Sequence, residues 1–240
     1  RRLRFGGRMR SREGGCVDWE SQFQRWVKAE DENPFDDRPA RLIVIETRKA
    51  ARNGASLDIS QGWRWVQEAL EDSDRRTFVH AVFHRQAAPK HLATVFLQKG
   101  VNERNPSANR LFVEPAVKAI GPRRVMERLT KLLLNASENE QGGAVSAAYW
   151  VRGDDGEQRY RDARQRFRDA MLQKFVDTDS TYVRQRIISM LSLDESDYSG
   201  DASALIAEAI HIARNHPDDY IRHRIEIQLG SAGPLRALPA

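Results

Sequence analysis

The sequence has a single cysteine, Cys16, and no long apolar run. One cysteine excludes an internal disulfide and a cysteine-rich zinc site, and it favours a reducing compartment. A membrane-spanning helix needs about 20 consecutive apolar residues, and no stretch of the chain approaches that length. The sequence therefore predicts a cytoplasmic protein that does not enter a membrane.

Sequence patterns of familiar catalytic sites are missing as well. There is no Gly-x-Ser-x-Gly elbow, no phosphate-binding loop and no dinucleotide-binding glycine pattern. His80 and His84 are four residues apart and could share a metal on one helix face, with His91 soon after. The glutamate of a metalloprotease helix is absent, however, and no third ligand has a recognisable spacing. We expect no catalytic residue, no metal and no cofactor.

What the chain does contain is a repeat. The segment YVRQRI at 182–187, followed by Leu191, returns 38 residues later as YIRHRI at 220–225, followed by Leu229. Such a return predicts stacked copies of one helical unit rather than a single mixed core. In each copy the apolar residues fall on one side of a helix, so Leu191 and Leu229 are predicted to be equivalent core positions.

Further helices are predicted around these two copies. Amphipathic patterns cover 122–135, 157–176 and 203–214. Asp74 and Asp179 each precede a first apolar helix position by four residues, so either can cap its helix. The pair Gly142-Gly143 is predicted to be a loop before a helix. The run at 42–45 would suit a strand, but no second strand is available to pair with it, so a helix is expected there as well.

These features resemble the HEAT-repeat family, whose unit is a pair of antiparallel helices with an Asp before the second helix and a Val-Arg pair that opens it. Asp179 and Val183-Arg184 match that pattern, and Ile221-Arg222 matches its second half. Pro217 and Ser146 depart from it, and the period is below the usual value of about 40 to 47. The resemblance implies an all-α fold: a right-handed α-solenoid of five to six antiparallel helix pairs.

Four parts of the chain are expected in such an array. Residues 1–16 would be a basic arm, either disordered or foreign to the protein. Residues 17–57 would form a divergent first repeat, residues 58–230 the HEAT-like repeats and residues 231–240 a tail.

The paired arginines of the two copies form two rows. By the resemblance, Arg184 and Arg222 would bond the turns between repeats, together with the Asp of a neighbouring unit. Arg186 and Arg224 have no such role in the family, so they are candidates for contact with an acidic partner. Trp65 is turned about 200° from Trp63, which faces the predicted core. It is therefore either packing between repeats or an exposed anchor for a partner.

Charge gives a weaker indication of function. Lys and Arg number 39 against 34 Asp and Glu, and the net charge of +5 is modest for 240 residues. The arginines at 159–168 stand near acidic residues at three and four spacing, so much of their charge can be paired within one helix.

The resemblance favours a protein–protein interaction scaffold that binds a partner through its concave surface and is not an enzyme. The alternative is a nucleic-acid-binding HEAT-like protein, at the extreme a DNA glycosylase-like enzyme, although no catalytic residue of those enzymes can be matched here. A third option is a subunit of a larger assembly.

Overall fold

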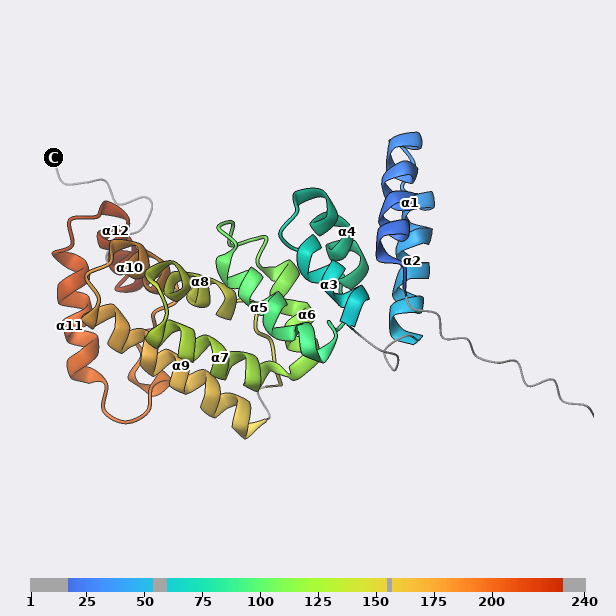
Figure 1. Cartoon of the computed structure of the whole chain (residues 1–240). Helices are drawn as coiled ribbons and strands as arrows, with labels where there is room; N and C mark the ends of the chain where they lie inside the picture. The colour runs from blue at the N-terminus through green and yellow to red at the C-terminus, as the bar shows by residue number, and fades with distance from the viewer. Residues whose placement is uncertain (1–16, 54–59, 155–156, 231–240) are drawn as a thin grey trace, which may run out of the picture. The chain divides into compact units, whose positions relative to one another are not determined.

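The computed structural model describes residues 17–53, 60–154 and 157–230 (Figure 1). These residues form twelve α-helices and two short 3-10 helices and contain no strand, which confirms the predicted all-α class. None of these helices is both long and apolar enough to cross a membrane. The predicted arm at 1–16 and tail at 231–240 lie outside the described residues.

Contacts divide the chain into two compact units, one ending at Phe83 and the other beginning at His84. The first unit consists of α1 (Trp19–Glu32), α2 (Arg38–Asn53), α3 (Ser60–Ala69) and α4 (Ser73–Phe83). Helix α1 contacts the other three, and α2 and α3 both contact α4. The predicted boundary between a divergent repeat and regular repeats near residue 57 stays a prediction.

Aromatic rings fill the core of the first unit. The ring centroids of Trp19 and Trp63 are 5.5 Å apart, and those of Phe23 and Phe78 are 6.0 Å apart. The run at 42–45 is part of α2, as expected, with Ile43 and Val44 buried. Helix α2 begins where Asp36 Oδ1 accepts a hydrogen bond from the Arg38 amide.

The second unit contains the remaining elements. In chain order these are η1 (Lys90–Leu92), α5 (Ala93–Asn102), α6 (Arg110–Ile120), α7 (Pro122–Asn135), α8 (Glu138–Ala148), α9 (Gln158–Asp177), α10 (Thr181–Ile188), η2 (Glu195–Asp197), α11 (Ser203–Arg214) and α12 (Asp219–Gln228). Helix α9 contacts both α7 and α11, and α10 contacts both α8 and α12. Since α7–α8, α9–α10 and α11–α12 also touch, these six helices form two rows of three (Figure 1).

The preceding pair does not continue this alternation. Helix α5, the first of its pair, contacts α8, and the second, α6, contacts α7. Gly121 alone separates α6 from α7, and its φ of 87° is a conformation that glycine adopts without steric cost. Because one residue joins the two helices, α6 stays beside α7, and α5 is left to pack on α8.

Glycines make the contacts of α8 possible. Gly142 and Gly143 are buried inside α8, so the predicted loop at this pair is wrong. A Cβ at Gly143 would lie 1.9 Å from the Val101 carbonyl oxygen of α5, and one at Gly142 would lie 2.5 Å from the Tyr182 ring of α10. The glycines therefore serve close helix packing rather than a turn. Helix α8 begins earlier, at the capping box formed by Ser137 and Glu140.

Candidate functional site

The first arginine of each copy bonds the chain just before its own helix. Arg184 Nε donates to the Phe175 carbonyl at 3.1 Å, and Arg222 donates to the His216 carbonyl. Burial lowers the pKa of Arg184, while the charge of Asp179 acts in the opposite direction. These bonds go to the last turn of α9 and to the turn between α11 and α12, so they lie within a helix pair rather than at the turns between repeats that the resemblance implied. The carboxylate that Arg222 contacts is Asp219 of its own helix rather than one of a neighbouring repeat.

The helix caps lie one residue later than the sequence pattern indicated. Ser180, not Asp179, caps α10 through a bond from the Val183 amide, and Asp218 caps α12 in the same way. Both caps also reach a neighbouring helix. Ser180 Oγ donates to Glu138 at the start of α8 at 2.7 Å, and Asp218 accepts from Gln185 of α10 at 2.9 Å. Hydrogen bonds thus join α8 to α10 and α10 to α12.

In the first unit the predicted cap is displaced in the opposite direction. Asp72 accepts hydrogen bonds from the amides of Asp74 and Arg75, whereas Asp74 lies inside α4. The spacing rule located the ends of these helices but not the capping residue itself, because several polar residues stand side by side in each turn.

The second arginine of each copy is not bound to an acidic residue in the parts of the chain that the structure describes. Arg186 places its guanidinium 5.2 Å from the centroid of the Tyr182 ring, and Arg224 holds a buried Nε that has no hydrogen-bond partner among the described residues. Tyr220 stands four residues before Arg224, as Tyr182 stands before Arg186, and is 46% exposed. We call these four residues the Tyr–Arg surface of α10 and α12.

Trp65 belongs to the first unit and packs against other side chains there. Its ring stacks on Trp19 at 6.0 Å between centroids, and its Nε1 donates to Glu20 at 2.7 Å. Bonds from Gln24 and Trp65, together with the charge of Arg75, lower the pKa of Glu20. Of the two predicted roles, the geometry matches packing between helices.

Leu191 and Leu229 are not equivalent, although the repeat places them in the same register. Leu191 is buried at 5% exposure, whereas Leu229 follows α12 and is 37% exposed. Within the described residues, helix α12 has a row neighbour on one side only, α10. The prediction of equal burial is therefore wrong for Leu229.

A further cluster escaped sequence reasoning. The Trp150 indole donates to the Pro106 carbonyl at 2.9 Å, and Arg110 lies over its ring at 5.4 Å. Arg152 lies over the neighbouring Tyr149 at the same distance. The signal in the sequence was the adjacent pair Tyr149-Trp150, but the partners of Trp150 come from Pro106 and from Arg110 at the start of α6, about 40 residues earlier. Glu114, which pairs with Arg110, keeps this cluster from being purely basic.

No group of His, Cys, Asp or Glu that could hold a metal occurs in the described parts of the chain. His80 lies in α4 of the first unit, while His84 begins the second unit and His91 lies in η1.

Comparison of the chain with protein-family models, with curated proteins and with solved structures found no match.

Proposed function

We propose that the protein is a non-enzymatic scaffold that binds a partner protein through the Tyr–Arg surface. The observation behind this proposal is that Tyr182/Arg186 and Tyr220/Arg224 recur at the same positions of two contacting helices. Tyrosine and arginine are enriched at the energetic centres of protein interfaces. Neither Arg186 nor Arg224 has a carboxylate partner within the described ranges, so both can meet an acidic surface.

The wider architecture proposed for this scaffold is HEAT-like. Pairs α7–α8, α9–α10 and α11–α12, with their contacts along two rows, would be three units of a right-handed α-solenoid, and the Tyr–Arg surface would lie on its concave side. The pair α5–α6 would join the array with its two helices exchanged. The full extent of five to six pairs is part of the same proposal.

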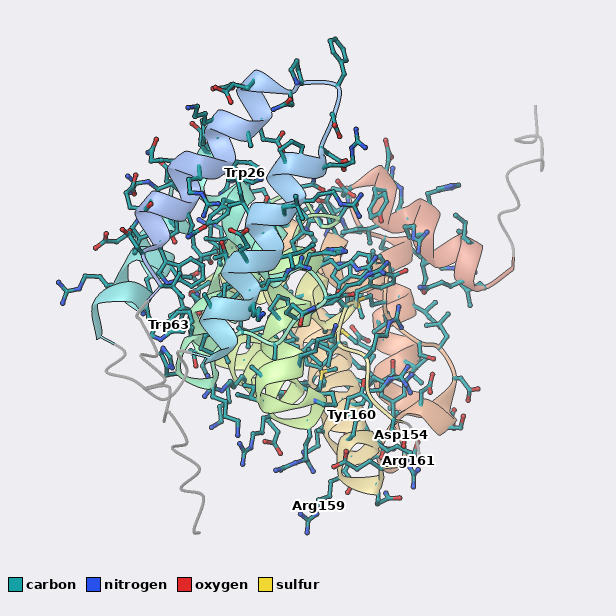
Figure 2. The ribbon with its side chains drawn as sticks, turned by 90° about the vertical axis from the view of Figure 1, so that its right-hand side faces the viewer. Trp26, Trp63, Asp154, Arg159, Tyr160 and Arg161 are labelled. Carbon is teal, nitrogen blue, oxygen red and sulfur yellow. The ribbon has the colours of Figure 1, made fainter. Side chains whose placement is uncertain are left out.

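Nucleic-acid binding receives less support from the arginines of α9. Arg166 lies 3.9 Å from Glu127, Arg168 forms an ion pair with Asp197, and Arg161 is hydrogen-bonded to Gln158. In Figure 2, Arg159 points away from the helices near the start of α9. Arginines already held by acidic or amide groups contribute less to a phosphate-binding surface, because those contacts must first be broken.

A pull-down of the full chain from native extract, with and without nuclease, tests the proposal. We expect a partner that survives nuclease treatment and is lost from the double variant Arg186→Glu/Arg224→Glu. The matched control is Arg104→Glu/Arg159→Glu, which makes the same charge change at two exposed arginines that have no ion pair in the described ranges. Equal retention by both double variants would contradict the proposed surface, and loss on nuclease treatment would favour nucleic acid.

A further inference from the structure

Helices α5 and α7 border a groove of about 500 Å³ in the second unit. Its lining consists of Thr94, Leu97, Gln98, Arg128, Lys131, Leu132, Asn135 and Ala136. Leu97 and Leu132 supply an apolar floor from the two helices, and the polar side chains stand along the edges. A space of this size accepts a few side chains or a short segment rather than a folded domain.

The α7 edge of the groove is basic. Arg128 and Lys131 line the groove, and Arg124 lies one turn before Arg128 on the same helix. At this four and three spacing the three side chains lie within about 60° of one another around the helix. All three are exposed, and none has a carboxylate partner in the described ranges. Arg128 donates to the Thr94 hydroxyl across the groove, which places its charge at the rim.

Nearby carboxylates do not neutralise this edge. Glu127 forms an ion pair with Arg123 at 2.8 Å and lies near Arg166 of α9. Glu140 accepts bonds from Ser137 and from Gln98, and these bonds lower its pKa. The positive charge along α7 therefore remains available to an incoming anion.

We propose that this groove binds an acidic amphipathic segment of a partner protein, with apolar side chains on Leu97 and Leu132 and carboxylates on the basic edge. This inference rests on the proposed scaffold function and names the partner's chemistry at a second place on the molecule. An extended nucleic acid fits less well, because the lining contains no aromatic ring on which a base could stack. Charge complementarity and the apolar floor together select the peptide.

The test measures fluorescence anisotropy of a labelled helical peptide of about 15 residues, with leucines at three and four spacing and glutamates beside them. A second peptide has lysine in place of every glutamate. We expect saturable binding of the acidic peptide to the full chain, and binding weaker by about tenfold or more for the basic one. A single-stranded DNA of similar charge forms a third arm.

Two kinds of variant locate the binding. We expect Arg128→Glu/Lys131→Glu to lower the affinity for the acidic peptide by about tenfold or more. The control Arg104→Glu/Arg159→Glu should change this affinity by less than about twofold. Thr94→Trp fills the groove without changing charge and should also weaken binding. Thermal melting by circular dichroism establishes that each variant is folded before its affinity is compared.

Three results would overturn the inference. The first is no saturation by the acidic peptide at about 1 mM, and the second is an equal loss of peptide affinity in the two double variants. The third is tight binding of the DNA that depends on Arg128 and Lys131, with no binding of the peptide. The scaffold function can be tested separately, because the pull-down variants Arg186→Glu and Arg224→Glu leave the groove intact. If a partner is captured in a way that depends on Arg186 and Arg224 but the acidic peptide does not bind, the groove proposal is rejected and the scaffold proposal is retained.

Discussion

Gly142 and Gly143 are adjacent in α8, but a side chain added at each would contact different atoms. A methyl group at Gly143 would meet the fixed backbone of Val101, and one at Gly142 would meet the outer part of the Tyr182 side chain, which can move. Alanine in a helix gains about 1 kcal/mol over glycine, and overpacking costs about 1 to 3 kcal/mol. We predict that Gly143→Ala lowers the free energy of unfolding, whereas Gly142→Ala changes it by less than about 1 kcal/mol.

Urea unfolding of both variants measures this difference, and each serves as the other's control because the gain in helix propensity is the same. Equal stabilisation of the two would mean that α5 and α8 do not approach as closely as the structure shows.

Leu191 and Leu229 allow a second comparison at single residues. Truncating a buried leucine removes about 2 to 5 kcal/mol of stability, and the cost shrinks when the side chain is already hydrated. We predict a loss in that range for Leu191→Ala and less than about 1 kcal/mol for Leu229→Ala, judged from unfolding midpoints and slopes. Similar losses at the two positions would restore the equivalence that the repeat alone suggests.

At the scale of helices, His216 connects α11 to α12. It is 5% exposed, and its Nδ1 accepts a hydrogen bond from the Asp218 amide at 3.0 Å. Burial is the main cause of its lowered pKa, and the charges of Arg184 and Arg222 add to it. Protonation would place a second donor opposite the Asp218 amide and break that bond.

The sign of the pH dependence follows from this lowered pKa. The unfolded chain binds the proton more readily, with a pKa near 6.5. The stability supplied by neutral His216 is therefore complete above about pH 6.5 and is lost as the pH falls through the lower folded value. We predict that unfolding free energy decreases from pH 8 toward pH 5, and that His216→Asn, which keeps an acceptor, flattens this dependence.

His223→Asn is the matched control, because it makes the same substitution at a histidine that is exposed on α12. Parallel pH profiles for the wild type and His216→Asn would remove His216 as the cause.

Much of the element structure could be predicted from the sequence, since periodic apolar residues mark the buried side of a helix whatever covers it. The all-helical class, the helix at 42–45 and the burial of Trp63 follow from that signal. The sequence could not predict which helix packs against the buried side of another. Periodicity does not reveal that α5 rather than α6 packs on α8, or that Gly142-Gly143 continues a helix, because both depend on how closely distant backbones approach.

Which of several neighbouring polar residues caps a helix could not be predicted either. Ser180, Asp218 and Asp72 cap their helices where the pattern favoured other positions. The repeat contains both tyrosines of the Tyr–Arg surface, but only its two arginines were predicted to contact a partner. The groove between α5 and α7 requires residues from helices about 30 positions apart in sequence.

At the scale of the whole molecule, the net charge of +5 is modest for 240 residues, and several arginines of the described ranges form ion pairs. Arg214 bonds Glu226 at 2.7 Å, and Arg110 bonds Glu114 at the same distance. A protein that binds DNA by neutralising several phosphates loses affinity steeply as salt rises from about 50 to 200 mM. We predict that duplex and single-stranded DNA bind weakly or not at all at about 150 mM salt.

Anisotropy titrations across salt concentrations check this prediction, with Arg186→Glu/Arg224→Glu as the comparison. Submicromolar affinity at about 150 mM salt, with a slope indicating six or more phosphate contacts that the variant flattens, would support the nucleic-acid alternative. Release of a base from alkylated DNA would contradict the non-enzymatic proposal as well.

The joint at Gly121 has a consequence for how the sequence can change. One residue connects α6 to α7, and its φ of 87° suits glycine. Substitutions on the exposed faces of both helices leave this joint untouched, whereas an inserted or deleted residue would rotate α7 by about 100° relative to α6 and expose its buried face. Insertions should therefore be tolerated in the longer connection at 103–109 but not here: at this point the protein is constrained in length more than in composition.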